Sequence, residues 1–226
     1  MDQPVSPLTI ASTVYEQLRG DILGARLEPG VKLRIDFVCQ RYGAGNTPVR
    51  EALNRLAADG LVLRYEQRGF AVSPMSGDEL AELTTTRCAI EAIALRNMLQ
   101  QRDSDWEERL VLSRHRLAQV PRSLTVDRFV ANPEWEQRHR DFHRALLGNC
   151  GSRWLLRYTE ELADHAYRYR QRSMQAAYPL RDVAAEHDAI AAAALAGESS
   201  RAVELLAAHY RRTAEGCASG RADVAR

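Results

Sequence analysis

The sequence predicts a mainly α-helical protein with an N-terminal winged helix-turn-helix and a C-terminal all-α helical bundle. Two observations support this fold class. Residues 9–75 have the order helix, helix, helix, β-hairpin, and residues 76–216 follow a helical periodicity almost throughout. The chain has 226 residues, of which 45% are hydrophobic and 27% charged, and this suffices for two modest globular domains.

The two ends of the chain are expected to lie outside these domains. Residues 1–8 contain two prolines and predict a disordered arm, while residues 217–226 follow Gly216 and predict a flexible tail. Charged residues interrupt every apolar run before the roughly 18 residues of a membrane span, and the N-terminus lacks the regions of a secretory signal. We therefore expect a cytoplasmic protein without membrane contacts.

The first two helices of the N-terminal domain follow from apolar spacing and turn residues. An apolar residue at every fourth position from Val14 to Ile22 predicts a helix within residues 11–27. A Glu-Pro-Gly turn then leads to a short helix over residues 34–42, in which we expect Phe37 to face inward.

The third helix has the clearest boundaries. Thr47 is a favourable N-cap, and Pro48 suits the first helical position, where its missing N–H is not needed. Gly60 suits the left-handed position that ends a helix. Two short β-type runs follow, LVLRY and FAVSP, on either side of residues 66–69, which predicts a hairpin.

This arrangement is typical of a DNA-binding domain, in which the N-terminal end of the recognition helix contacts bases in the major groove. The net charge of +1 gives no global support for DNA binding, so the prediction depends on where the charges lie. The alternative is a small helical domain whose arginines only solvate its surface. The candidate DNA-binding residues are Arg34, Asn46, Thr47, Arg50, Arg68 and Gly69.

These segments resemble the GntR family of bacterial transcription regulators. The resemblance rests on TPVREALNRLAADGLVLRYEQRGFAV and on the upstream VYEQLRGDILGARLEPGVKLR, and it covers residues 12–74. The family usually has Ser-Arg before Thr-Pro, whereas this chain has Gly45 and Asn46. A major-groove arginine is therefore absent, and since asparagine tends to read adenine, the operator is expected to differ from the commonest family site.

Histidines carry the chemistry of the helical domain. No C-x-x-C pair occurs, which excludes a cysteine-based zinc finger, but His139 and His143 lie four residues apart on one predicted helix. Such a pair can bind one metal ion, because imidazole nitrogens suit Zn²⁺ and similar cations. The alternative is two half-exposed histidines on an arginine-rich helix.

The same domain resembles the FCD-type effector domain of the FadR subfamily, many members of which bind a divalent metal. The segments DFHRALLGNCGSRWLL, EHDAI and AAHY match its three ligand-bearing segments, which implies that His143, His187 and His209 are ligands. His139 stands where the family usually has aspartate. The resemblance thus implies a four-histidine site for zinc, with nickel and manganese as alternatives, in which no carboxylate cancels the charge of the ion.

Arginines are the candidates for binding an effector. The family often has an arginine at the position of Arg87, facing the pocket and pairing with an effector carboxylate, and bidentate pairing makes this chemically reasonable. The alternative is an intrahelical ion pair with Glu91. Arg168 and Arg170 are weaker candidates for the pocket, and His115 and His165 are expected on the surface or in helix packing.

Together these features predict a transcription regulator, and not an enzyme, that acts as a repressor. A small carboxylate or dicarboxylate bound at the metal would release it from double-stranded operator DNA. A homodimer is expected, because a two-fold protein reads a pseudo-palindromic operator. The alternatives are a metal-dependent hydrolase fused to a DNA-binding module and a regulator whose metal is purely structural.

Overall fold

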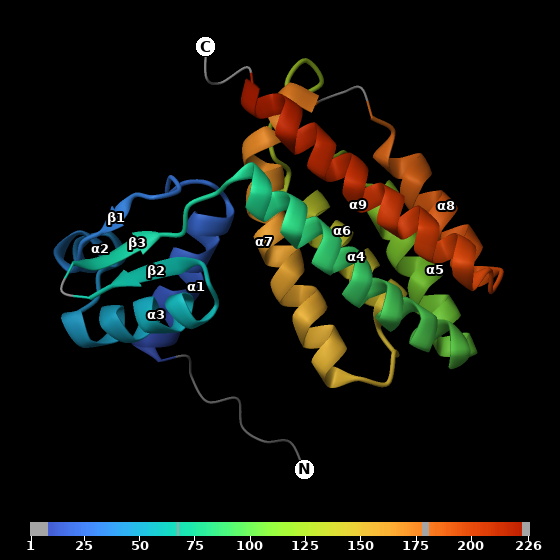
Figure 1. Cartoon of the computed structure of the whole chain (residues 1–226), viewed down its shortest axis with the longest axis horizontal. Helices are drawn as coiled ribbons and strands as arrows, with labels where there is room; N and C mark the ends of the chain where they lie inside the picture. The colour runs from blue at the N-terminus through green and yellow to red at the C-terminus, as the bar shows by residue number, and fades with distance from the viewer. Residues whose placement is uncertain (1–8, 67, 178–180, 223–226) are drawn as a thin grey trace. The chain divides into compact units, whose positions relative to one another are not determined.

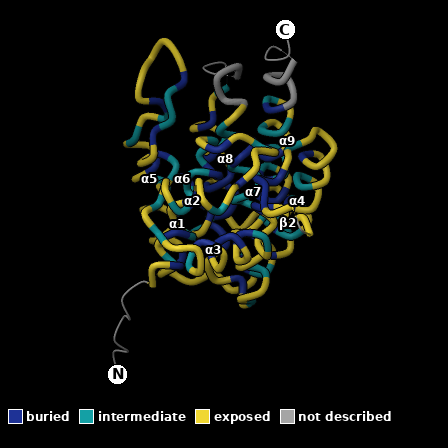
Figure 2. The backbone as a smooth tube through the Cα atoms, turned by 90° about the vertical axis from the view of Figure 1, so that its left-hand side faces the viewer, coloured by how far each residue is buried: buried dark blue, intermediate teal, exposed yellow. Residues whose placement is uncertain are grey.

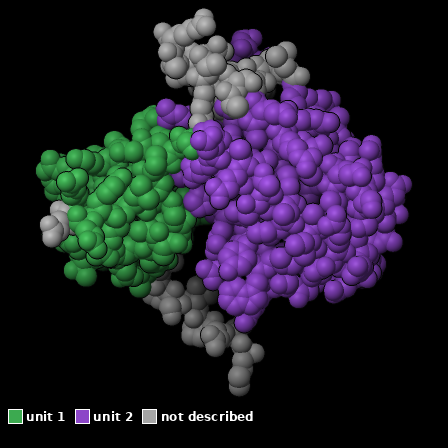
Figure 3. Space-filling model, in the orientation of Figure 1, with its two compact units in different colours: residues 1–76 green, residues 77–226 purple. Residues whose placement is uncertain are grey.

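The protein has two compact units, residues 1–76 and residues 77–226 (Figure 3). The structure is a computed structural model, and it describes residues 9–66, 68–177 and 181–222. The disordered arm predicted for residues 1–8 therefore lies outside the described residues.

The N-terminal unit combines three helices with a small antiparallel sheet (Figure 1). Its helices are α1 (Ile10–Leu23), α2 (Ile35–Tyr42) and α3 (Asn46–Ala58). Helix α1 packs against α3, and the apolar positions that repeat along both helices are buried between them. This buried face consists of Val14, Leu18, Ile22, Val49, Leu53 and Leu56.

The predicted hairpin consists of β2 (Val62–Tyr65) and β3 (Gly69–Val72). The sequence did not predict a third strand, β1 (Lys32–Leu33), which pairs with β3 on its other side and gives the sheet order β1-β3-β2. Two residues are too few to show the alternation of a strand, so no sequence pattern could reveal β1.

The start of α3 differs from the prediction, since the helix begins at Asn46 and its N-cap is Gly45, without a side-chain cap bond. The assignment of Thr47 as N-cap was wrong. Pro48 is tolerated as the third helical residue because none of the first four N–H groups of a helix has an intrahelical partner. Phe37 was also predicted to face inward, but its side chain is 43% exposed.

The C-terminal unit is a bundle of helices, as the periodicity predicted (Figure 1). Figure 2 colours the buried positions of the chain dark blue. The core is centred on aromatic and aliphatic side chains such as Trp106 and Phe142, neither of which is exposed. The helices are α4 (Gly77–Gln100), α5 (Ser104–Ala118), α6 (Pro133–Leu147), α7 (Arg153–Ala177), α8 (Val183–Leu195) and α9 (Ser199–Ala222).

Helix α9 extends beyond its predicted end and includes residues 217–222, which were assigned to a flexible tail. A glycine inside a helix costs only about 1 kcal/mol, so Gly216 does not end α9 where packing continues. Cys217 directly after it is buried. Residues 223–226 lie outside the described residues.

Candidate functional site

Four histidines from three helices converge inside the C-terminal unit. His139 and His143 lie on α6, His187 lies on α8 and His209 on α9, and one ligand nitrogen from each lies within 4.8 Å of the others. All four side chains are buried. The alternative of half-exposed histidines on α6 was therefore wrong.

Local structure explains why these rings meet. Positions four residues apart share one helix face, so His139 and His143 point the same way from α6. Helix α8 is capped by the side chain of Asp182, which accepts from the backbone N–H of Ala185 and so fixes the turn that carries His187. Helix α9 packs against α8 and thereby brings His209 to the cluster.

Two of the histidines are oriented by acceptors on their Nδ1 side. The Nδ1 atom of His209 lies 2.8 Å from a carboxylate oxygen of Glu186, which Arg181 also holds. The Nδ1 atom of His143 lies 3.1 Å from the hydroxyl of Tyr210, which in turn donates to Glu91. Such partners fix the tautomer of a metal-binding histidine and leave Nε2 bare for the ion.

His139 has different neighbours. The indole of Trp135 stacks on its ring with the centroids 4.7 Å apart, and Arg170 approaches its Nδ1 atom at 3.3 Å. Arg170 also donates to Glu136. The Nε2 atoms of His139 and His143 are 3.1 Å apart.

Burial sets the protonation of the cluster. It lowers the pKa of all four histidines, that of His209 to about 4 even though Glu186 opposes the shift. Burial alone would raise the pKa of Glu186, but hydrogen bonds from Arg181 and His209 hold that pKa well below its usual range. The four rings are therefore neutral at pH 7, the form that binds metal ions.

The donor set fits a divalent metal that prefers nitrogen ligands. Two nitrogens that bind one zinc ion tetrahedrally at about 2.0–2.1 Å lie about 3.3 Å apart. The 3.1 Å between the Nε2 atoms of His139 and His143 is close to this, and it is also the distance of a hydrogen bond between the two rings. The Nε2 atom of His187 is buried and has no hydrogen-bond partner among the described residues, as expected of a nitrogen that needs a ligand.

A cavity of about 260 Å³ opens beside His139 and His143. Four arginines line it, and each has a carboxylate partner within 3 Å. Arg87 forms the predicted alternative ion pair with Glu91 at 2.6 Å, and it lines the cavity as well. The four pairs are Arg87–Glu91, Arg140–Asp164, Arg144–Glu160 and Arg170–Glu136.

The remaining candidates of this unit lie elsewhere. Arg168 is buried and does not line this cavity, whereas Arg170 does. His115 is exposed and His165 half-buried, and neither belongs to the histidine cluster.

In the N-terminal unit, the predicted DNA-binding residues lie on exposed positions of the helix-turn-helix and the hairpin. Asn46, Thr47 and Arg50 occupy the first turns of α3, and the Oδ1 atom of Asn46 accepts a hydrogen bond from the Sγ of Cys39 at 3.2 Å. Arg34 precedes α2 and pairs with Asp36.

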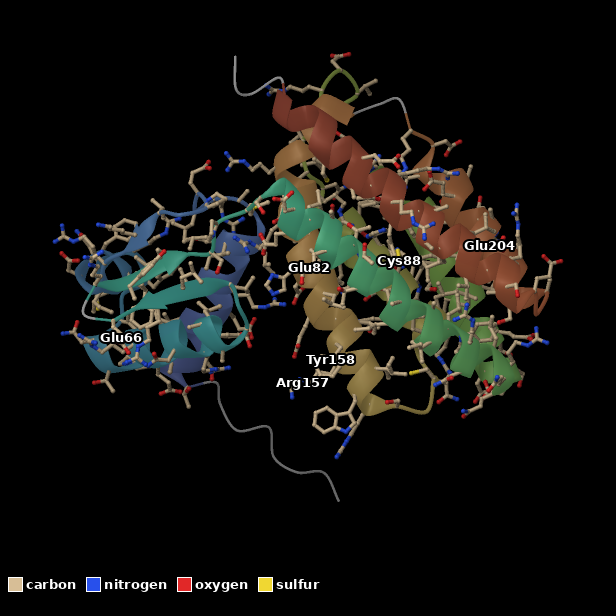
Figure 4. The ribbon with its side chains drawn as sticks, in the orientation of Figure 1. Glu66, Glu82, Cys88, Arg157, Tyr158 and Glu204 are labelled. Carbon is tan, nitrogen blue, oxygen red and sulfur yellow. The ribbon has the colours of Figure 1, made fainter. Side chains whose placement is uncertain are left out.

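Arg68 lies in the turn between β2 and β3, and Gly69 is the first residue of β3; Glu66, which begins the same turn, is labelled in Figure 4. The backbone of Gly69 has a φ of +86°, a conformation that favours glycine.

Comparison with known proteins agrees with both units. Residues 10–72 match the model of bacterial regulatory proteins of the gntR family, and residues 82–212 match the FCD domain model. The chain belongs to the GntR family. Since FCD-containing members form the FadR-like subfamily, this GntR chain is a transcription regulator of that subfamily and not an enzyme.

Individual relatives support the same assignment. This GntR chain is 39% identical to the uncharacterized HTH-type transcriptional regulator BphR of Paraburkholderia xenovorans, over 90% of this chain and 86% of the relative. It is 33% identical to the HTH-type transcriptional repressor GlaR of Escherichia coli, over 86% of this chain and 90% of the relative.

The fold is shared with solved GntR structures. The E. coli McbR/YncC structure superposes with a TM-score of 0.72 at 20% identity, over 91% of this chain and 95% of that one. A GntR-family regulator from Pseudomonas syringae gives a TM-score of 0.53 at 23% identity, over 95% and 86% of the two chains. Among the described helices, none is long and apolar enough to cross a membrane.

Sequence reasoning missed several residues around the histidines of this GntR regulator. Tyr210 directly follows His209 and was not predicted to be part of the site. Its hydroxyl contacts His143 instead of its sequence neighbour His209. Trp135 precedes His139 by four positions, the spacing that places side chains on the same helix face. Arg181 gave no signal, because only the fold brings it to Glu186 and α9.

Proposed function

We propose that this GntR-family regulator is a repressor whose binding to operator DNA is controlled by a small carboxylate or dicarboxylate held at a divalent metal in the FCD unit. The observation that carries the proposal is the buried cluster of four neutral histidines beside a cavity lined by arginines. The relative GlaR is a transcriptional repressor, which favours repression over activation.

The metal would be zinc, with nickel or manganese as alternatives, and its ligands would be drawn from the cluster of His139, His143, His187 and His209. When bound, the ion would supply Lewis acidity and could accept an oxygen atom of an effector as a further ligand. Glu186 and Tyr210 hold His209 and His143 in the tautomer that leaves Nε2 bare. Arg87 is the proposed partner of an effector carboxylate, for which it would have to exchange Glu91.

The DNA-binding surface would comprise the first turns of α3, with Asn46, Thr47 and Arg50, together with Arg34, Arg68 and Gly69. A homodimer would place two such surfaces on the half-sites of a pseudo-palindromic operator. The effector can shift operator affinity only by its difference in affinity for the DNA-bound and DNA-free forms. A protein that binds chromosomal DNA would work in the cytoplasm.

Metal content tests the central step. Mass spectrometry of the purified protein should find about one zinc-like ion per chain, and the double variant His143→Ala/His187→Ala should lose it. The zinc-loaded protein should then give a thermal shift with small carboxylates that the double variant does not give. Absence of metal from the wild type, even after reconstitution, would refute the proposed metal centre.

A chelator separates a sensing metal from a purely structural one. If the metal only holds the fold, its removal should unfold the FCD unit, because the energy of binding is then energy of folding. We expect instead that the metal-free protein still melts cooperatively, at a lower temperature, and loses the thermal shift with carboxylates.

A further inference from the structure

The hydrogen bonds around each imidazole determine which of its nitrogens can bind a metal. A neutral imidazole carries one proton, so one nitrogen donates while the other is bare and can bind an ion. A partner that only accepts hydrogen bonds therefore requires a proton on the nitrogen it contacts, and a partner that only donates requires that nitrogen to be bare. The four histidines of the cluster differ in this respect.

Two histidines have a bare Nε2 atom facing the cluster, and a third has an Nε2 atom placed to bind the ion. The carboxylate of Glu186 requires the proton of His209 to be on Nδ1. The hydroxyl of Tyr210 gives its own proton to Glu91, so it accepts from the Nδ1 of His143. The Nε2 atom of His187 is buried without a hydrogen-bond partner among the described residues.

His139 has the opposite arrangement. Its Nδ1 atom lies 3.3 Å from Nη1 of Arg170, and a guanidinium only donates. The Nδ1 atom must therefore be bare, and the proton is on Nε2. That proton has an acceptor in the metal-free site, because the bare Nε2 of His143 is 3.1 Å away. One proton assignment thus satisfies every contact from Arg170 through the two rings and Tyr210 to Glu91.

Given the metal centre proposed above, we propose that His139 is not a fourth metal ligand but a hydrogen-bond donor, fixed in its Nε2–H form by Arg170. The metal is held by His143, His187 and His209, and the His139 proton points at an oxygen bound to that metal. The oxygen belongs to water or to a carboxylate that enters from the cavity, since His139 and Arg170 both line it.

Two contacts keep His139 in this role. The stacked indole of Trp135, at an interplanar angle of 13°, limits the ring to motion in its own plane. The ion pair of Arg170 with Glu136 is largely buried, with 13% and 10% of the two side chains exposed, and holds the guanidinium beside Nδ1. An aspartate in place of His139 would bring a negative charge to the metal, whereas His139 brings a directed proton and no charge.

Nitrogen-15 NMR of the imidazole rings tests the proton assignment directly. In the metal-free protein, His139 should show the Nε2–H tautomer and both His143 and His209 the Nδ1–H tautomer, with peaks assigned by single His→Gln variants. On adding zinc, the Nε2 signals of His143, His187 and His209 should shift as metal-bound nitrogens. His139 should keep its Nε2–H signal, and a metal-bound Nε2 on His139 would overturn the proposal.

Zinc affinity, measured by competition with a chromophoric chelator, tests the roles separately. His143→Gln should weaken binding by at least about 100-fold, whereas His139→Gln should change it by less than about 10-fold. Arg170→Gln supplies an acceptor for the Nδ1 proton, so His139 can become a ligand and zinc should bind more tightly. The control is Arg157→Gln, also on α7 but outside the cavity (Figure 4), which should leave the affinity unchanged.

A double-mutant cycle distinguishes positioning from simple charge repulsion. If Arg170 acts through His139, the gain from Arg170→Gln should disappear in the His139→Gln background. A gain of the same size in both backgrounds would overturn the role of Arg170. If the wild type binds no zinc, the metal centre itself fails, whereas tight zinc binding with His139 as a ligand would refute only the donor role.

Discussion

Replacing Tyr210 with phenylalanine isolates one hydrogen-bonded link between a proposed metal ligand and the rest of the FCD unit. The hydroxyl of Tyr210 lies 3.1 Å from the Nδ1 of His143 and donates to Glu91. Phenylalanine keeps the ring, including its stacking with Arg87, whose guanidinium carbon lies 3.8 Å from the ring centroid. The substitution therefore removes one buried oxygen together with its hydrogen bonds to His143 and Glu91.

The expected magnitudes follow from that loss. The Nδ1 proton of His143 loses its acceptor inside the protein, which costs about 1–3 kcal/mol of unfolding free energy. For a protein of this size, each kcal/mol lowers the melting temperature by about 2–4 °C. Loss of a partner that orients a ligand typically weakens metal binding by about 10- to 100-fold.

The assay pairs thermal unfolding with zinc competition, and Tyr158→Phe serves as the matched control. Tyr158 lies on the exposed side of α7, labelled in Figure 4, and 46% of it is exposed, so the same substitution there should change neither quantity measurably. A Tyr210→Phe variant that melts lower but binds zinc within about twofold of the wild type would refute the orienting role of the hydroxyl.

Two further predictions concern the DNA-binding unit. Hydrogen bonds from Arg26, Arg41 and Tyr42 hold the pKa of Asp21 below its usual value, although burial alone would raise it. Asp21→Asn should therefore cost about 1–3 kcal/mol at pH 7. The difference from the wild type should shrink as the pH falls below about 3.9, the unfolded-state pKa, because the wild-type carboxylate then begins to lose this advantage. Urea unfolding at pH 7 and pH 3 measures it, and an equal difference at both values would contradict the reasoning. Arg50→Ala should weaken binding to a duplex selected by the wild type by about 1–3 kcal/mol, and unchanged binding would remove Arg50 from the DNA contacts.

The sequence predicted the helices and the hairpin because their signals are local. The structure contains the helix α1 that its apolar residues at every fourth position predicted. It also contains the left-handed Gly60 after α3, with φ of +72°, and the long helices of the bundle. The errors lie where local signals are weak or compete. Helix α3 begins earlier than predicted, because proline is acceptable at several positions of a first helical turn. Helix α9 continues beyond Gly216, because tertiary packing outweighs the cost of one glycine.

The histidine cluster could be predicted only in part. The pair on α6 was visible as a spacing of four, whereas His187 and His209 entered through family resemblance, since nothing local links residues on different helices. The neighbours that decide what each ring can do, Arg170, Tyr210 and Glu186, depend on how α7, α9 and α8 pack. The spacing of histidines in the sequence can suggest metal ligands. Which nitrogen of each ring carries the proton, and so whether the ring can bind the metal, depends on neighbours that only the fold brings together.

Charge explains why the proposed metal, more than any arginine, would attract the effector. Each arginine of the cavity is paired with a carboxylate, so the lining contributes little net positive charge. The histidines are neutral, and a divalent ion among them would keep nearly its full charge, because the cluster contains no carboxylate. An entering carboxylate must break an existing ion pair to use an arginine, whereas it meets an uncompensated cation at the metal. On this proposal a carboxylate oxygen of the effector would bind the metal first. A second anionic group of the effector would then displace the carboxylate partner of one arginine.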